Sequence, residues 1–206
     1  MTELDRLIDA PHETIDAIAA HLDSLSASER WDHVGALGRD RQRTLFDKAA
    51  HARPIDFAHF VGTAKPREEV IHDGMNTLPL PPPLRRFQKR FCRPPGHADH
   101  LAGYNEGPTR AVVGPGYFLA IPTTERPAWA ARGAIVVDYF QVPDASEIAA
   151  GWPAVVDNNW RLQRFVYHQT RDFMRRVSRH VSVGAAFKRE RPLDHFFVLC
   201  CRDTAS

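Results

Sequence analysis

One carboxylate of the sequence lies where its surroundings would give it chemistry. Asp138 stands within the run 133–142, which is rich in Val, Ile, Tyr and Phe and predicts a strand. A carboxylate among apolar neighbours is costly to bury unless it is paired. Asp138 therefore faces solvent, with the alternate row that contains Tyr139 turned inward, or it faces a cavity with Lys89 or an arginine of 161–179. In a cavity it could act as a general acid or base.

Three more polar residues, Tyr104, Asn105 and Glu106, lie in a segment rich in glycine and proline. Gly114 and Gly116 follow closely, and their spacing matches neither a phosphate-binding loop nor a dinucleotide fingerprint. These glycines instead predict positive φ, a bulge or a close backbone approach where a strand begins. The three polar residues would then stand at the mouth of a cavity, where polar groups orient a ligand.

The histidines of His97-Ala98-Asp99-His100 have the residue types of a metal site. The preceding Pro-Pro-Gly makes the segment a loop, and a metal would need further ligands, of which only scattered ones are visible, such as His72 and Glu106. We therefore expect a solvated loop, with no metal and no cofactor. No Gly-x-Ser-x-Gly elbow is present, and nothing marks Cys92 as a nucleophile.

The overall charge gives no reason to expect a polyanionic partner. The 206 residues carry a formal net charge of only +2. Two arginine-rich segments, 85–93 and 161–179, could bind anions, a membrane surface or nucleic acid, but solvated faces and local ion pairs are the default interpretation of such segments. We expect no nucleic-acid partner.

The cysteines and the first residues favour a cytoplasmic location. Three cysteines, two of them adjacent, are a poor disulfide framework and indicate reduced thiols. The acidic start lacks the apolar core of a secretory signal, and no apolar run reaches about 18 residues, so we expect no integral membrane segment.

The polar residues must be positioned by a helical part followed by a strand-rich part. Apolar spacing predicts helices over about 3–26, 28–38 and 40–50, within a helical portion of about 1–65. These helices could cap a sheet, or they could dock a second subunit and so form a homodimer.

The β-rich portion covers about 66–203, and we expect a single domain over 1–206. Strand patterns recur with short connections at 69–76, 85–93, 101–104, 117–122, 133–142, 181–187 and 195–201. Short connections favour an antiparallel sheet that curls into a barrel or is strongly curved. Residues 161–179 predict one late helix before the last two strands, with strand, turn and strand as the alternative. The fold class is therefore α+β.

The second half also resembles an uncharacterised bacterial family. The segments that carry this resemblance are 103–105, 114–118, 138–139, 151–153 and 175–184. The closing Phe196-Phe197-Val198-Leu199 is similar to the last strands of lipocalin-like (calycin) barrels. The resemblance implies a barrel that binds a small apolar ligand, and it transfers no catalytic residue.

These observations support three hypotheses. The first is non-catalytic binding of a small apolar or amphipathic ligand in a β-barrel cavity, with the candidate ligand-binding residues Lys89, Tyr104, Asn105, Glu106, Tyr117, Asp138 and Tyr139. The second is an enzyme that uses a cavity carboxylate, Asp138 or Glu106, as acid or base. The third is an interaction module for anions, membrane surfaces or nucleic acid. The sequence does not decide whether the protein is an enzyme, and it assigns no catalytic residue.

Overall fold

A computed structural model describes residues 1–202 of the chain. The helices before the first strand are α1 (Glu3–Asp9), α2 (Ile15–Ser24), α3 (Ala27–Val34), α4 (Arg39–Lys48), the short 3-10 helix η1 (Ala49–His51) and α5 (Phe57–Val61). Side-chain N-caps begin four of them, at Thr2, Thr14, Ser26 and Asp56. Thr2 and Ser26 each form a capping box, which satisfies amide groups that a helix start leaves unpaired.

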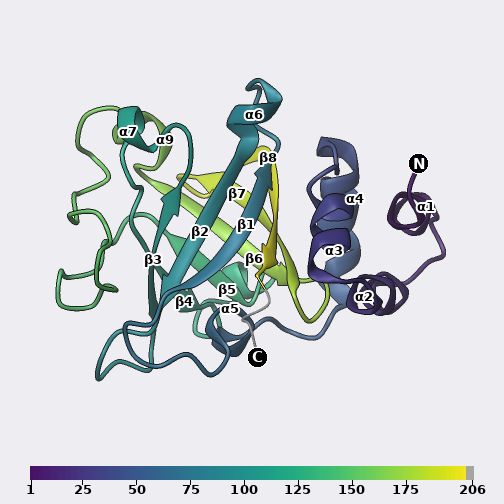
Figure 1. Cartoon of the computed structure of the whole chain (residues 1–206), viewed down its shortest axis with the longest axis horizontal. Coiled ribbons are helices and arrows are strands. Elements are labelled where there is room, and N and C mark those ends of the chain that lie inside the picture. The colour runs from purple at the N-terminus through teal and green to yellow at the C-terminus, as the bar shows by residue number, and fades with distance from the viewer. Residues whose placement is uncertain (203–206) are drawn as a thin grey trace.

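The rest of the chain forms a closed antiparallel barrel in which each strand pairs with its neighbours in sequence (Figure 1). Its strands are β1 (Val70–Asn76), β2 (Arg86–Cys92), β3 (Leu101–Glu106), β4 (Phe118–Pro122), β5 (Ile135–Asp138), β6 (Thr170–Arg176), β7 (Val181–Lys188) and β8 (Arg191–Cys201). Pairing of β1 with β8 closes the sheet, so no edge is left open. The predicted α+β fold, helices followed by an antiparallel barrel, is confirmed.

Single-turn helices occupy several of the connections between strands. They are α6 (Pro82–Arg85), α7 (Arg110–Val113), α8 (Pro127–Ala130) and α9 (Gln163–Val166). In Figure 1, α6, α7 and α9 lie around one end of the barrel, and α5 lies at the opposite end. Different helices therefore lie over the two ends of the barrel.

The end near α5 is filled by apolar side chains. Phe60 of α5 packs on Phe91, with 4.7 Å between the ring centroids, and its carbonyl oxygen lies 2.9 Å from Nε2 of the buried His72. Phe118, Leu199 and other inward-facing residues continue this core. This half of the interior is therefore an apolar core, and the cavity described below lies toward the other end.

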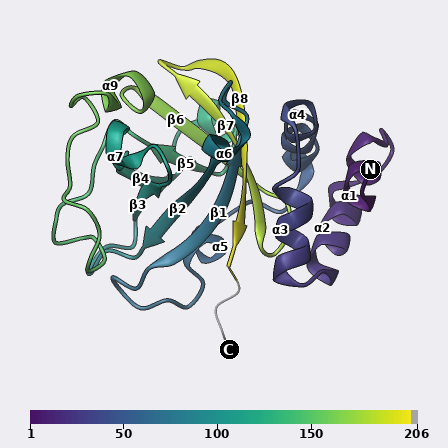
Figure 2. The ribbon, with the colours of Figure 1, turned by 45° about the horizontal axis from the view of Figure 1, so that its top comes forward.

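Helices α3 and α4 pack against the outer face of β7 and β8, and α1 packs on α4 and α2 (Figures 1 and 2). Val183 and Val198 face outward from these strands and join a core with helical residues such as Ile8, Leu22 and Leu45. The helices thus cap a sheet face of their own chain. A homodimer through these helices stays a prediction.

The late helix is shorter than the predicted range of 161–179. Only Gln163–Val166 is helical, and Thr170–Arg176 is strand β6. Gln169 has a positive φ of 61°, which ends the helical turn. Both faces of β6 are covered, since Met174 points into the barrel core and Phe173 packs beneath Trp129 outside it. Apolar residues on both faces hide the alternation that would have marked a strand.

Along the chain, a helical part precedes a strand-rich part. Helices α1–α5 lie before residue 66, and β1–β8 lie after it. Position 203, the expected end of the β-rich portion, lies outside the described residues. Among residues 1–202, every helix is too short or too polar to cross a membrane.

Candidate functional site

A cavity of about 550 Å³ lies at the end of the barrel near α6, α7 and α9. Most of its wall is apolar. Its apolar residues come from the segment leading into α6, from α6, α7 and α9, and from the barrel interior. They are Leu78, Leu84, Phe87, Val113, Phe165, Val166 and Phe197. Leu84, Phe165 and Val166 are also exposed large apolar residues. The apolar lining therefore continues to the rim, and the volume falls within the range of about 300–1,000 Å³ typical of small-molecule sites.

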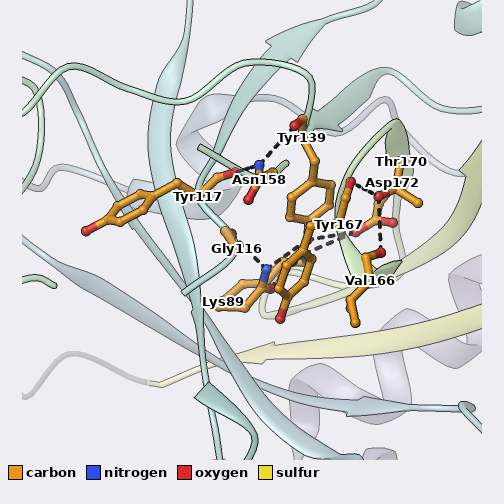
Figure 3. Close-up of polar contacts among 10 residues, drawn as sticks. Lys89, Gly116, Tyr117, Tyr139, Asn158, Val166, Tyr167, Thr170 and Asp172 are labelled. Carbon is orange, nitrogen blue, oxygen red and sulfur yellow. Dashed lines mark hydrogen bonds and ion pairs between the residues drawn. The ribbon is translucent and has the colours of Figure 1, made fainter. Parts of the chain in front are cut away.

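Polar side chains gather around Lys89 in the wall of this cavity (Figure 3). Lys89 Nζ donates hydrogen bonds to Asn105 Oδ1 at 3.1 Å, to the Tyr139 hydroxyl at 2.5 Å and to Asp172 Oδ2 at 3.1 Å. The Lys89 residue is 1% exposed. Its ammonium has three hydrogens, so these three acceptors satisfy it completely.

The strands bring these residues together because inward-facing positions alternate along each of them. Lys89 lies opposite Asn105 in the β2–β3 pairing, and Asp172 lies opposite Val137 in the β5–β6 pairing. Tyr139 follows the end of β5. Its hydroxyl accepts a hydrogen bond from Asn105 Nδ2 and donates one to Asp172 Oδ2. We call Lys89, Asn105, Tyr139 and Asp172 the polar cluster.

Burial and mutual attraction act in opposite directions on the charged members of the polar cluster. Burial lowers the pKa of Lys89, while the neighbouring Asp172 carboxylate raises it, and the net change is downward. Burial likewise raises the pKa of Asp172 against the attraction of Lys89. The proton affinities of the two groups are therefore closer together than in water, which is a property of groups that exchange protons.

Tyr167 covers the polar cluster from the segment that follows α9. Its ring stacks on Tyr139, with 5.2 Å between centroids and 22° between planes. Within residues 1–202 its hydroxyl makes no hydrogen bond to the protein, and Tyr167 lines the cavity. The Tyr167 hydroxyl is thus available to a ligand.

Gly114 and Gly116 allow this covering segment to approach the barrel. Both have positive φ, and a Cβ at Gly114 would lie 2.5 Å from the Gln163 side chain, while one at Gly116 would lie 2.5 Å from the Tyr167 ring. The Gly116 amide donates to Gln163 Oε1 at 2.8 Å, and its carbonyl accepts from Asn105 Nδ2 at 3.0 Å. The sequence-based expectation of positive φ and close backbone approach is confirmed at both glycines.

Two of the candidate ligand-binding tyrosines lie on the outside of the barrel. Tyr104 and Tyr117 pack together and against Trp152 of the loop after β5. The Tyr117 hydroxyl donates to the Pro153 carbonyl at 2.5 Å, and Figure 3 shows its side chain directed away from Lys89. Neither tyrosine lines the cavity. Both hold the loop against the barrel wall.

Asp138 also faces outward, because Val137 and Tyr139 on either side of it turn into the barrel. It is buried all the same, and its Oδ2 lies 3.2 Å from Nε of Arg171 on β6. Its Oδ1 accepts a hydrogen bond from the Phe140 amide. Of the two orientations considered from the sequence, the one with the Tyr139 row inward is therefore found, with an arginine partner added.

Glu106 lies at the rim of the cavity, apart from the polar cluster. It is in the cavity lining, and its Oε1 accepts hydrogen bonds from Arg110 Nε at 2.6 Å and from the Gly107 amide at 3.0 Å. These partners occupy the carboxylate. The cavity therefore brings together Lys89, Asn105 and Tyr139, with Glu106 near its entrance.

Asp172 and Tyr167 belong to the site but were not among the residues chosen from the sequence. Both fall in the range 161–179, which the sequence predicts as a helix. A helix would not direct them toward the inward-facing residues of the strands. Asp172 was visible as the single acid among the six arginines of 161–179. Read as a strand, this segment puts Thr170, Asp172 and Met174 on one face, which is the signal that would have identified it.

The arginine-rich segments have partners inside the protein. Arg90 pairs with Glu69 at 3.2 Å, and Arg171 pairs with Glu190 at 2.7 Å as well as with Asp138. Lys89, the one lysine of the first segment, is in the barrel interior. Binding of anions or nucleic acid by these segments stays a prediction.

No protein-family model matches the chain, and no curated protein or solved structure is detectably similar to it. The class of protein is therefore defined by its fold and its cavity. It is a closed antiparallel barrel of eight strands with an apolar cavity at one end and a buried polar cluster in the cavity wall.

Proposed function

We propose that this protein is a lipocalin-like binding protein that holds a small amphipathic molecule in the barrel cavity. The observation that carries the proposal is the combination of an apolar cavity of about 550 Å³ with a fully buried polar cluster in its wall. A small number of polar groups in an otherwise apolar wall fixes the orientation of a small ligand. The apolar part of the ligand would lie against Phe87, Phe165 and Phe197.

The polar cluster favours an uncharged head group. Lys89 and Asp172 neutralise each other at 3.1 Å, so a ligand charge placed beside them would lack a partner in a region of low dielectric. The Tyr167 hydroxyl, which has no hydrogen-bond partner within residues 1–202, can donate to a carbonyl or hydroxyl oxygen. A hydroxyl or carbonyl group on an apolar body fits both observations.

Titration with Nile red, an uncharged apolar dye with a carbonyl group, tests this function. We expect saturable binding with one dye per chain, with an emission shift typical of an apolar environment and with displacement by a long-chain alcohol. Phe165→Ser removes apolar contact area at the rim and should weaken binding about fivefold, corresponding to about 1 kcal/mol.

Phe140→Ser is the matched control for this titration. Phe140 is also an exposed phenylalanine, 45% exposed against 67% for Phe165, but it does not line the cavity. Its replacement should leave the dye affinity unchanged. Equal loss of affinity in both variants, or binding that does not saturate, would show that the dye reports general surface hydrophobicity and would reject the proposal.

A second function is favoured by the opposed pKa changes of Lys89 and Asp172. A carboxylic acid of raised pKa, hydrogen-bonded to the Tyr139 hydroxyl and lining a cavity, is suited to general acid or base catalysis. In this case the carboxylate is Asp172, in place of the Asp138 or Glu106 expected from the sequence. Chemical conversion of a bound molecule that stops in Asp172→Asn, with dye affinity retained, would support catalysis. Recovery of the unaltered molecule from both the original protein and Asp172→Asn would support binding without catalysis.

A further inference from the structure

Two histidines and a glutamate converge at the end of the barrel far from the cavity. His97 and His100 lie in the loop between β2 and β3, and Glu147 lies in the long loop after β5. One ligand atom from each of the three residues lies within 4.8 Å of the other two. His100 directly precedes β3, whereas the cavity is lined from the other end of that strand, by Asn105 and Glu106. This group is therefore separate from the polar cluster.

Two of the three distances between ligand atoms in this group are those of a tetrahedral zinc site. Nε2 of His97 and Nε2 of His100 each lie 3.4 Å from the same atom, Glu147 Oε1. Two ligands that are each about 2.1 Å from a zinc ion at the tetrahedral angle lie about 3.4 Å apart. Two neutral imidazoles and one carboxylate also form a donor set that zinc and related transition metals accept.

The protonation of His100 is arranged for coordination through Nε2. Its Nδ1 lies 3.1 Å from a carboxylate oxygen of Asp99, so the ring proton belongs on Nδ1 and the lone pair on Nε2. His100 is 8% exposed, and its Nε2 is buried without a hydrogen-bond partner. A lone pair that faces a carboxylate oxygen is unfavourable unless a positive charge, either a metal ion or an added ring proton, lies between them.

Glu147 is held so that only one oxygen faces the histidines. Its Oε2 accepts a hydrogen bond from the Asp144 amide at 2.7 Å, which closes a turn. Its backbone carbonyl accepts from the Cys92 thiol at the end of β2. The loop is thereby fixed against β2, and Oε1 stays directed at the histidines.

We propose that His97, His100 and Glu147 bind one divalent transition-metal ion of the zinc type, with Asp99 orienting His100 from behind. Water fills the remaining position, since His97 is partly exposed. The ion joins the loop after β5 to the β2–β3 connection, and so fastens the segment that carries Trp152 against Tyr104 and Tyr117. This proposal departs from the expectation of no metal, because Glu147 is distant in sequence from the histidines.

Zinc binding to the full-length protein, stripped with a chelator, tests this site. We expect one Zn²⁺ retained per chain after gel filtration and a Tm that rises with Zn²⁺ but not with Mg²⁺, which prefers oxygen ligands. His97→Ala and Glu147→Gln should each abolish the Zn²⁺-dependent rise in Tm. Asp99→Asn should lower the zinc affinity about tenfold, the effect of losing a carboxylate that orients a ligating histidine.

His12→Ala is the matched control, because His12 is exposed and lies outside the cluster. It should bind zinc as the unaltered protein does. No retained zinc, or retention that is equal in His97→Ala, Glu147→Gln and His12→Ala, would overturn the proposal. That result would leave a charged imidazolium pairing with Glu147 as the explanation of the geometry. Nile red binding should not depend on zinc, so the two proposals can fail independently.

Discussion

At the scale of single residues, the buried ion pair of Lys89 and Asp172 is the feature with the largest energetic consequence. Each charge is removed from water, and each depends on the other for compensation. Such a pair contributes little net stability compared with apolar residues of the same size. Loss of one partner, however, leaves a buried charge without compensation.

Lys89→Met should therefore lower the free energy of unfolding by about 3 kcal/mol or more. The double variant Lys89→Met, Asp172→Asn should recover most of this loss, because no charge then remains buried. Denaturant unfolding of the two single variants and the double variant measures the coupling. Additive losses would show that the two residues do not form the ion pair described.

Two buried histidines near α5 make stability depend on pH. Burial lowers the pKa of His72 from the ordinary 6.5 to about 4, against a hydrogen bond to the Phe60 carbonyl that raises it. Burial also lowers the pKa of His59, and His72 and Arg176 lower it further. Both side chains are therefore neutral in the folded protein at pH 7.

Stability should fall as the pH drops from about 6.5 to about 4. In this window the unfolded chain binds a proton at His72 and the folded chain does not, so protonation favours unfolding. The contribution of His72, fully present above pH 6.5, amounts to about 3 kcal/mol. His72→Gln keeps a donor to Phe60 but does not titrate, and urea unfolding across this range should show a shallower pH slope for it. An unchanged slope would contradict the assignment.

Much of the polar cluster could be predicted from single positions. Lys89 alternates with Phe87 and Phe91 in the sequence, and this pattern indicates a position that faces the barrel interior. Asp172 could not be found in the same way, since its strand has buried residues on both faces and its apolar spacing also fits a helix. Glu147 lies in a loop without periodicity, so only the folded chain shows what it faces.

At the scale of elements, glycine determines how closely the strands pack inside the barrel. Gly103 on β3 faces inward, and a Cβ there would lie 2.4 Å from the Phe118 ring and 2.6 Å from the Arg90 carbonyl oxygen. Phe118 in turn contacts Lys89, with Nζ 4.9 Å from the ring centroid. The absence of a side chain at Gly103 therefore leaves room for an aromatic ring next to the polar cluster.

Gly103→Ala should lower the free energy of unfolding by about 1–3 kcal/mol, the range observed for overpacked cores. Gly38→Ala is a suitable control, because no atom lies within 4 Å of the added Cβ and its change should stay below about 1 kcal/mol. Thermal and denaturant unfolding compare the two variants. Equal, small effects would mean that Phe118 does not occupy the space above Gly103.

Element boundaries were predictable where one face of a strand or helix is apolar and the other polar. The capped helices before residue 50 and strand β1 are of this kind. Strand β6 and the single-turn helices α6–α9 are not, because they owe their conformation to contacts with distant parts of the chain. Gln163 of α9, for example, accepts a hydrogen bond from the amide of Gly116, 47 residues earlier.

At the scale of the whole molecule, the two ends of the barrel differ in how they are filled. Aromatic and aliphatic side chains fill the end near α5, and the opposite end contains the cavity. Helices α1–α4 lie beside the barrel next to β7 and β8, away from both ends (Figure 2). Exposed side chains of α6 and α9, Leu84, Phe165 and Val166, mark where the cavity lining reaches the surface.

The most direct test of ligand binding is native mass spectrometry of the protein purified from its own host, compared with Ala186→Phe. Ala186 faces Asp172 across the β6–β7 pairing and lines the cavity, so a phenylalanine there would fill the space above the polar cluster. The account predicts a mass above that of the chain, lost on denaturation and absent from Ala186→Phe. A bare chain mass for the unaltered protein, or the same added mass on folded Ala186→Phe, would contradict it.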